Sequence, residues 1–170
     1  MPAGVRPLGH MEQRNEILEV LGHLSVSYSM ADETVTKLAV FLLQCRDIEI
    51  ARYVTEGLEL SRKIERARWL LDRYTQQPAV KETVAELRSL LEDIKVTAAR
   101  RNEIVHAHID WNALTETAKF GLINPKKRTK VDLDVPAITI LSIQMAQNAV
   151  RVEVLTYKLL NDLGLNVKTE

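Results

Sequence analysis

Residues 80–108, VKETVAELRSLLEDIKVTAARRNEIVHAH, decide the fold of this chain. Positions that suit a buried helix face recur in steps of three and four, at Val84, Leu87, Leu91, Ile94, Ala98, Val105 and His108. This spacing keeps one side of an α-helix pointed toward a partner. The stretch therefore predicts a long helix, from about Val80 to His108, that packs against other helices.

The same stripe also passes through position 101, which holds an arginine. A guanidinium on an inward stripe stays charged and needs hydrogen-bond acceptors. Asn102 and His106 stand four residues apart, so they project from the same side of the helix. Two explanations are open. Arg101, Asn102 and His106 form a ligand site, or Arg101 pairs with Glu103 or another helix's carboxylate while the other two cap a helix end.

Further helices are predicted on both sides of this stretch. The first runs from about Met11 past 42, with a stripe at Ile17, Leu21, Leu24, Tyr28, Ala31, Val35, Leu38, Leu42 and Cys45. A broken helical segment follows from Asp47 to Tyr74, interrupted at Gly57, and a last helix runs from Asp134 to Gly164. The fold class is therefore all-α, an antiparallel four- to five-helix up-and-down bundle. One domain over residues 11–166 follows a disordered tail, residues 1–10.

Residues 112–135 form a short irregular or hairpin insertion before the last helix. Two runs with strand character, 119–123 and 129–133, flank a turn at Asn124 and Pro125. The turn carries a basic cluster made of Lys126, Lys127, Arg128 and Lys130. A solvated loop is one interpretation of this cluster. The other is contact with a nucleic-acid backbone, because nearby cations bind phosphates.

Composition excludes several classes of protein. Lys plus Arg and Asp plus Glu are balanced at 23 each, so the chain has no overall basic excess for bulk binding to DNA. No apolar run approaches the roughly 18 residues that span a bilayer. The single cysteine, Cys45, cannot form an internal disulfide, which favours a cytoplasmic location. No phosphate-binding glycine loop, zinc pattern or nucleophile motif occurs, and no cofactor is expected.

A metal site at residues 106–110 is also not expected. His106-Ala107-His108-Ile109-Asp110 alternates like a metal-binding sequence. On a helix, however, His106 and His108 would point about 200° apart and could not share one ion. A metal site here would require a strand in place of the helix.

Arg101-Asn102-Glu103-Ile104-Val105-His106, late on a long bundle helix, resembles the R-x4-6-H motif of the HEPN superfamily (higher eukaryotes and prokaryotes nucleotide-binding domains). Asn102 stands at the position that the family favours, and Trp111 after the histidine is similar to many members. The resemblance implies a homodimer whose two motifs face each other across a cleft. Many members are metal-independent endoribonucleases, often toxins or phage-defence effectors.

Carried over to this chain, the resemblance makes His106 the general base on a ribose 2′-hydroxyl. Arg101 would hold the scissile phosphate, and Asn102 would orient the substrate or the histidine. RNA, a second copy of the chain and a cognate antitoxin or other protein are the partners that it implies. The alternative is a non-catalytic dimeric helical module that binds a protein partner or a nucleotide, as some HEPN proteins do.

Two surface features complete the sequence-based expectations. Apolar residues lie beside the main stripes, at Leu90, Ala99, Ile104, Ile140, Ile143, Val150 and Val154, and such widened faces favour a two-fold interface. The run Arg62-Lys63-Ile64-Glu65-Arg66-Ala67-Arg68 mixes charges at helical spacing. It predicts a solvated face with i,i+4 pairs, and phosphate binding is the alternative.

Overall fold

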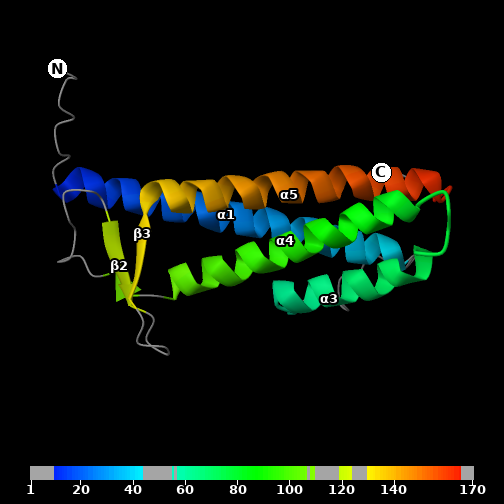
Figure 1. Ribbon diagram of the computed structural model, residues 1–170, viewed down its shortest axis with the longest axis horizontal. Helices are drawn as coiled ribbons and strands as arrows, with labels where there is room; N and C mark the ends of the chain where they lie inside the picture. Colours follow the sequence, from blue (N-terminus) through cyan, green and yellow to red (C-terminus); the bar gives the residue numbers. More distant parts are fainter. Residues whose placement is uncertain are drawn as a thin grey trace, which may run out of the picture.

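The computed structural model describes residues 10–43, 55, 57–106, 108–109, 119–123 and 130–165 (Figure 1). Four α-helices occur in these residues: α1 (His10–Leu43), α3 (Leu60–Leu71), α4 (Lys81–Val105) and α5 (Val135–Asp162). A short 3-10 helix, η1 (Asp72–Tyr74), extends α3. The all-α bundle predicted from the apolar stripes is confirmed.

Interhelical contacts fix the directions of the helices. Ser27 and Ser142 hydroxyls lie 2.9 Å apart, and Lys37 Nζ lies 3.6 Å from a Glu153 carboxylate oxygen, so α1 and α5 run parallel. Arg68 bonds Glu92 and Arg88 bonds Asp72, which makes α3 and α4 antiparallel. Figure 1 shows α4 running antiparallel to α5, and α3 lying beside only part of the length of α4. The parallel α1–α5 pair was not predicted.

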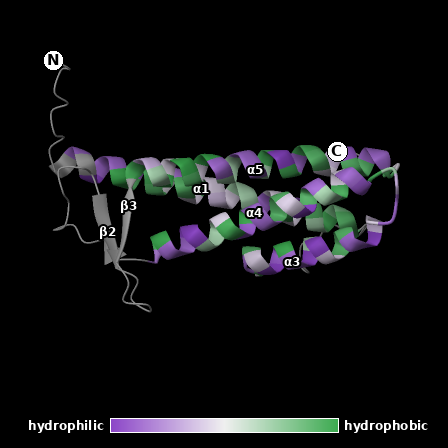
Figure 2. Ribbon diagram, viewed as in Figure 1, coloured by the Kyte–Doolittle hydropathy of each residue, from purple (hydrophilic) through white to green (hydrophobic). Residues whose placement is uncertain are grey.

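The apolar stripes bury two clusters of side chains. The larger cluster joins all four helices and contains Val35, Leu38, Ile64, Leu91 and Met145. The smaller one joins the starts of α1 and α5 to the end of α4, through Ile17, Val20, Leu24, Ile104, Val135 and Ile138. Figure 2 shows hydrophobic residues along the length of α5. Because α3 takes no part in the smaller cluster, the bundle is thinner at that end.

The end of α4 differs from the sequence prediction. The helix stops at Val105, and His106 is its C-cap, whereas continuation to about His108 was expected. Val105 is 40% exposed and Ile104 only 2%, so the predicted stripe position at 105 is wrong. Ile104 packs with α1 and α5 in the smaller cluster, and this contact turns the buried side of the last turn away from Val105.

The predicted hairpin before the last helix is present. Strands β2 (Lys119–Ile123) and β3 (Lys130–Asp134) pair antiparallel, and β1 (His108–Ile109) pairs with β2 to complete a three-stranded sheet. Pairing of His108 with Ile123 requires extended backbone, which accounts for the early end of α4. Asp134 precedes α5, as expected for its start, and Gly164 follows its end with φ of +67°.

Several predictions fall on residues outside the described ones. These are the tail over residues 1–9, Cys45, the short helix from Asp47 and residues 110–118. Gly57, where the sequence predicted an interruption, has a φ of +73° that favours glycine. Helix α1 begins at His10, one residue inside the predicted tail.

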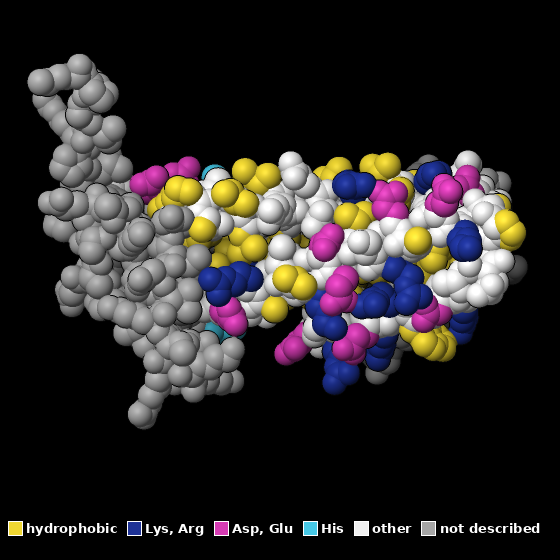
Figure 3. Space-filling model, viewed as in Figure 1, with side chains coloured by type: hydrophobic (Ala, Val, Ile, Leu, Met, Phe, Trp, Pro, Cys, Tyr) yellow, Lys and Arg dark blue, Asp and Glu magenta, His cyan; other side chains and the backbone are white. Residues whose placement is uncertain are grey.

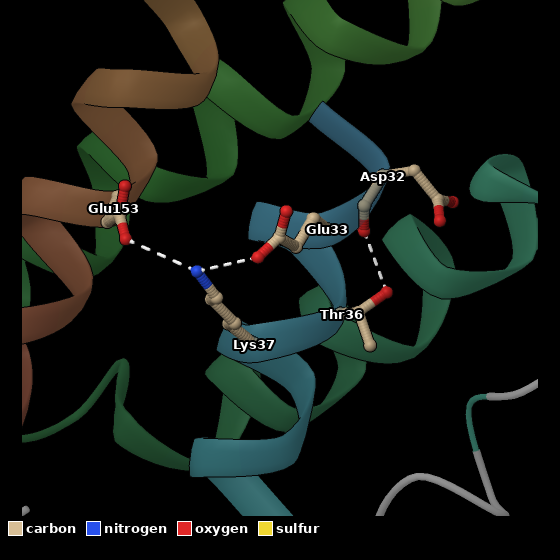
Figure 4. Close-up of polar contacts among 5 residues, drawn as sticks. All are labelled: Asp32, Glu33, Thr36, Lys37 and Glu153. Atoms are coloured by element: carbon tan, nitrogen blue, oxygen red, sulfur yellow. Dashed lines mark hydrogen bonds and ion pairs between the residues drawn. The ribbon is translucent and has the colours of Figure 1, made fainter. Parts of the chain in front are cut away.

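Surface charge is distributed unevenly over the helices. Lys, Arg, Asp and Glu side chains cover the lower right of Figure 3, over α3 and the adjoining part of α4, whereas hydrophobic side chains persist along the upper edge over α5. Lys37 of α1 lies between Glu33, at 2.9 Å, and Glu153 of α5 (Figure 4). Within the described residues, no helix is both long and apolar enough to cross a bilayer.

Candidate functional site

A cleft opens where α3 begins part-way along α1 and α4. Its volume is about 390 Å³, and its lining comes from one residue of α1, the first turn of α3 and the last three turns of α4: Tyr28, Glu59, Leu60, Ser61, Ile64, Lys95, Ala98, Ala99, Arg101, Asn102 and His106. All three residues of the predicted site, Arg101, Asn102 and His106, therefore line one cavity.

Arg101 is held in this cleft by an aromatic ring and an amide. Its guanidinium carbon lies 4.4 Å from the centroid of the Tyr28 ring, a cation–π contact from α4 to α1. Its Nη1 donates a hydrogen bond to Asn102 Oδ1 at 3.1 Å. Its Nε is buried and has no hydrogen-bond partner in the described part of the chain.

The structural alternative for Arg101 required a carboxylate partner. Glu103 instead accepts a hydrogen bond from Arg100 at 2.8 Å. No ion pair to Arg101 is found among the described residues, although a guanidinium carries a charge that needs acceptors. An inward cation with a spare donor has the chemistry of an anion-binding group.

Other groups in the cleft suit the same ligand. Lys95 is half-buried one and a half turns before Arg101, and His106 is exposed at the helix end. Ser61 lies in the first turn of α3, whose N-cap, Glu59, makes no side-chain capping bond. Amide groups at a helix start favour anions. The Glu59 side chain opposes this preference, although it is exposed.

Tyr28 enters the cleft as a neutral phenol. Burial raises the pKa of Tyr28, the nearby Asp32 carboxylate raises it further, and Arg101 acts in the opposite direction. Because the pKa stays above its ordinary value of 10.0, the hydroxyl keeps its proton at neutral pH and can donate a hydrogen bond.

The other predicted site residues are not brought into the cleft by the described structure. Lys126, Lys127 and Arg128 lie outside the described residues, and Lys130 is described only as the first backbone position of β3. Sequence reasoning missed Tyr28, Lys95 and Ser61 as parts of the site. Only Tyr28 could have been noticed in the sequence, because its hydroxyl group stands in a stripe whose neighbouring positions are aliphatic.

His106 and His108 do not lie on one continuous helix, although the sequence prediction assumed one. Because α4 ends at Val105 and His108 lies in β1, that assumption is wrong. No cluster of three His, Cys, Asp or Glu side chains suited to a metal ion occurs in the part of the chain that could be searched, which leaves out the His108 side chain and Asp110.

Comparison of the chain with family models, with curated proteins and with solved structures found no match. The residues of the cleft and the resemblance of the motif are therefore the features that point to a function.

Proposed function

We propose that the protein is a metal-independent endoribonuclease of HEPN type, with the Arg101–His106 cleft as its active site. The observation that carries the proposal is Arg101 itself. Its charge faces a cleft, its Nε donor has no partner among the described residues, and the cleft also contains His106. A phosphodiester supplies the charge and the acceptors that this side chain needs.

The proposed reaction uses the 2′-hydroxyl of the RNA as nucleophile. His106 removes the hydroxyl proton, and the 2′-oxygen attacks the adjacent phosphorus. The bond from phosphorus to the 5′-oxygen breaks, and that oxygen takes a proton from water. The hydroxide left behind takes the proton held by His106, which restores the neutral imidazole. The products are a 2′,3′-cyclic phosphate and a 5′-hydroxyl. An imidazole suits this role because its reference pKa, near 6.5, permits proton exchange near neutrality.

Arg101 stabilises the charge that develops on the phosphoryl oxygens in this reaction. A guanidinium presents paired donors that match phosphate, and a site that excludes water strengthens its effect. Tyr28 and Asn102 hold the guanidinium on two sides, so it is oriented before the substrate binds. Asn102 is therefore a positioning residue for Arg101 in this proposal.

Cleavage of labelled single-stranded RNA in excess EDTA tests the proposal. Wild-type protein should cleave, and Arg101→Ala and His106→Ala should each lose cleavage. Arg100→Ala is the matched control, because it removes the neighbouring cation, which is 40% exposed and bonded to Glu103. Cleavage that stops in EDTA, or that survives both site substitutions, would rule out the mechanism.

A role as a toxin or phage-defence effector, acting in the cytoplasm, belongs to the same proposal. Such a ribonuclease needs a neutralising partner, so a cognate antitoxin or another protein is a proposed partner. RNA degradation during expression of the wild type, but not of His106→Ala, is the expected result in cells.

Homodimer formation is proposed on a separate observation. Outward positions of α5 recur at spacings of three and four over about 26 Å, at Ile140, Ile143, Gln147, Val150, Val154 and Tyr157. The five apolar members are between 45% and 61% exposed. By contrast, Leu90 and Ile104, which were expected to widen the face of α4, are buried in the core.

This outward stripe of α5 favours the second candidate function, a non-catalytic dimeric helical module. No residue of α5 lines the cleft, so a dimer made only through this stripe leaves each cleft to a single chain. The facing motifs implied by the HEPN resemblance would need a different surface.

Light scattering of Ile143→Glu distinguishes these arrangements, with Val96→Glu, at a site 62% exposed on α4, as the control. A monomeric Ile143→Glu variant that still cleaves RNA is expected if the interface and the active site are independent. Loss of cleavage together with dimer loss would support a cleft shared between two copies.

A further inference from the structure

The outward side of α3 and η1 carries an aromatic residue among arginines. Arg62, Arg66, Trp69 and Arg73 follow one another at spacings of four, three and four, so they form a single stripe, here called the α3 stripe. The buried side of the same helix is already complete without them, since Leu60, Ile64, Ala67, Leu70 and Leu71 supply its core contacts. The α3 stripe is therefore not required for packing.

Trp69 is the central residue of the α3 stripe. It is 60% exposed, which is unusual for so large a ring on a mostly charged helix. The guanidinium carbon of Arg73 lies 4.6 Å from the ring centroid, so one part of the indole is held by a cation–π contact. The remaining ring surface faces a shallow depression formed with Leu58, Arg62, Glu65 and Arg66.

The charges along the stripe are mostly positive. Three arginines stand on it, and Glu65 beside it bonds Arg62 at 3.1 Å, with both side chains more than half exposed. Asp72, near the far end, is bonded to Arg88 of α4. Exposed ion pairs of this kind contribute little and leave the cation available to another anion.

The α3 stripe and the cleft start at the same end of α3. Glu59, Leu60 and Ser61 line the cleft, and Arg62 is the next residue of α3. From Ser61 to Arg73 the helical rise amounts to about 18 Å, which accommodates a few nucleotides beyond the cleft. Figure 3 shows Lys and Arg side chains interspersed with Asp and Glu over this part of the molecule.

We propose that the α3 stripe binds single-stranded RNA that extends from the cleft, with a base stacked on Trp69 and the backbone phosphates on Arg62 and Arg66. An exposed ring between arginines offers both contacts that unpaired nucleic acid uses. Duplex RNA fits poorly, because its bases are already stacked and paired. A protein-binding hot spot would need more apolar surface around the tryptophan than Leu58 alone provides. The proposal rests on the proposed function in that RNA enters the cleft, although binding can be measured without cleavage.

Binding of a labelled 2′-O-methyl oligouridylate tests the stripe, because that probe lacks the 2′-hydroxyl and cannot be cleaved by the proposed reaction. Trp69→Ala should weaken binding about 5- to 140-fold, the loss expected for one stacked base. Trp69→Phe should restore most of the affinity. Arg62→Ala and Arg66→Ala should each lower the slope of affinity against salt by about 0.7 on logarithmic axes. Val96→Ala, an exposed apolar control on α4, should bind like the wild type.

Fluorescence gives a second readout from the stripe itself. The chain has two tryptophans, so Trp111→Phe leaves Trp69 as the only one, and its emission should be quenched as the oligonucleotide binds. Unchanged emission at saturation, or equal affinities of Trp69→Ala and Val96→Ala, would overturn the proposal. A change in oligomeric mass in Trp69→Ala without a change in affinity would overturn it in favour of a protein interface.

The outcomes also separate this inference from the proposed function. Binding that depends on Trp69 in a protein that cleaves no RNA would refute the nuclease and keep the α3 stripe. Cleavage that depends on Arg101 but has the same KM in Trp69→Ala would refute the stripe and keep the nuclease.

Discussion

Lys63 and Arg101 are two cations that face the interior of the bundle, and their surroundings differ sharply. Lys63 of α3 is 8% exposed, and its Nζ donates a hydrogen bond to an Asp32 carboxylate oxygen at 2.6 Å. Arg101 of α4 stacks on Tyr28 and bonds only an amide oxygen among the described residues. Lys63, paired with a carboxylate, has a structural role. Arg101 is held in place without a counter-charge among the described residues, which suits binding of an anionic ligand.

The polar groups around Asp32 and Lys63 nearly all have partners. Thr36 Oγ1 donates to the Asp32 backbone carbonyl at 2.7 Å, and Lys37 on the next position is shared between Glu33 and Glu153 (Figure 4). Every cation of this region that the structure describes has a carboxylate within reach. The cleft at Arg101 lies about one turn of α1 away, at Tyr28; Glu59 also lines it, but among the described residues no carboxylate forms an ion pair with Arg101.

The largest difference between the two regions should appear in catalysis. If the cleft is the proposed nuclease site, Arg101→Ala should lower the rate of RNA cleavage about 10²- to 10³-fold, the usual cost of removing one donor that stabilises transition-state charge. Lys63→Met should leave the rate unchanged, because Lys63 does not line the cleft. Initial rates measured well below the melting temperature of both variants test this. Equal losses in the two variants would remove the distinction between the sites.

In contrast to the effect on catalysis, the loss of stability should be larger for Lys63→Met than for Arg101→Ala. Lys63→Met leaves Asp32 partly buried without its partner, and we expect a loss of about 1–3 kcal/mol in the free energy of unfolding. This value is set below that of a fully buried pair because the Asp32 side chain is 33% exposed. Arg101→Ala should cost less than about 1 kcal/mol, since it removes one cation–π contact and an unpaired donor.

Urea unfolding of the two variants beside the wild type measures these free energies. A larger loss for Arg101→Ala than for Lys63→Met would mean that Arg101 is a structural residue. The second candidate function, a binding module without chemistry, would then be favoured.

A double-mutant cycle sharpens the assignment of Lys63 to Asp32. If the ion pair is the main role of both residues, Asp32→Asn combined with Lys63→Met should lose less stability than the sum of the single variants. The expected coupling is on the order of 1 kcal/mol. The corresponding cycle between Arg101 and Glu103 should give no coupling, because Glu103 bonds Arg100. Coupling in the second cycle alone would contradict the geometry.

Sequence periodicity predicted the bundle because helix stripes depend on local spacing alone. Ile17, Leu38, Leu91 and Ile138 are buried where the pattern required, and β2 and β3 lie where strand and turn residues indicated a hairpin. The prediction for Lys63 was wrong, because the mixed-charge run around it indicated a solvated face and Lys63 is buried. Its burial depends on Asp32, 31 residues away, and a local pattern carries no information about which helices meet.

The candidate site was predictable in part for the same reason. Arg101, Asn102 and His106 share one helix end, so their proximity follows from helix geometry. Tyr28, Lys95 and Ser61 join them only because α3 begins beside α1 and α4 at this level, which is a tertiary feature. The exposure of Val105 in place of Ile104 arises similarly, from packing of the last turn of α4 on α1 and α5.

The smallest expected effect concerns the proton of Tyr28, which lies between the two regions. Burial and Asp32 raise its pKa, and Arg101 lowers it, so Arg101→Ala should raise the pKa of Tyr28 further. Arg100→Ala should not change it.

A pKa raised in the folded state contributes stability that is complete below the ordinary value of 10.0 and is lost as the pH rises through the folded pKa. Without Arg101, that alkaline loss should still begin near pH 10.0 but should continue to higher pH, because only the folded pKa has risen. Ultraviolet titration of the phenolate, with Tyr28→Phe subtracted to isolate this group, measures the shift. A fall in the pKa in Arg101→Ala would mean that the guanidinium does not act on Tyr28, and the cation–π contact that holds Arg101 in the cleft would be excluded.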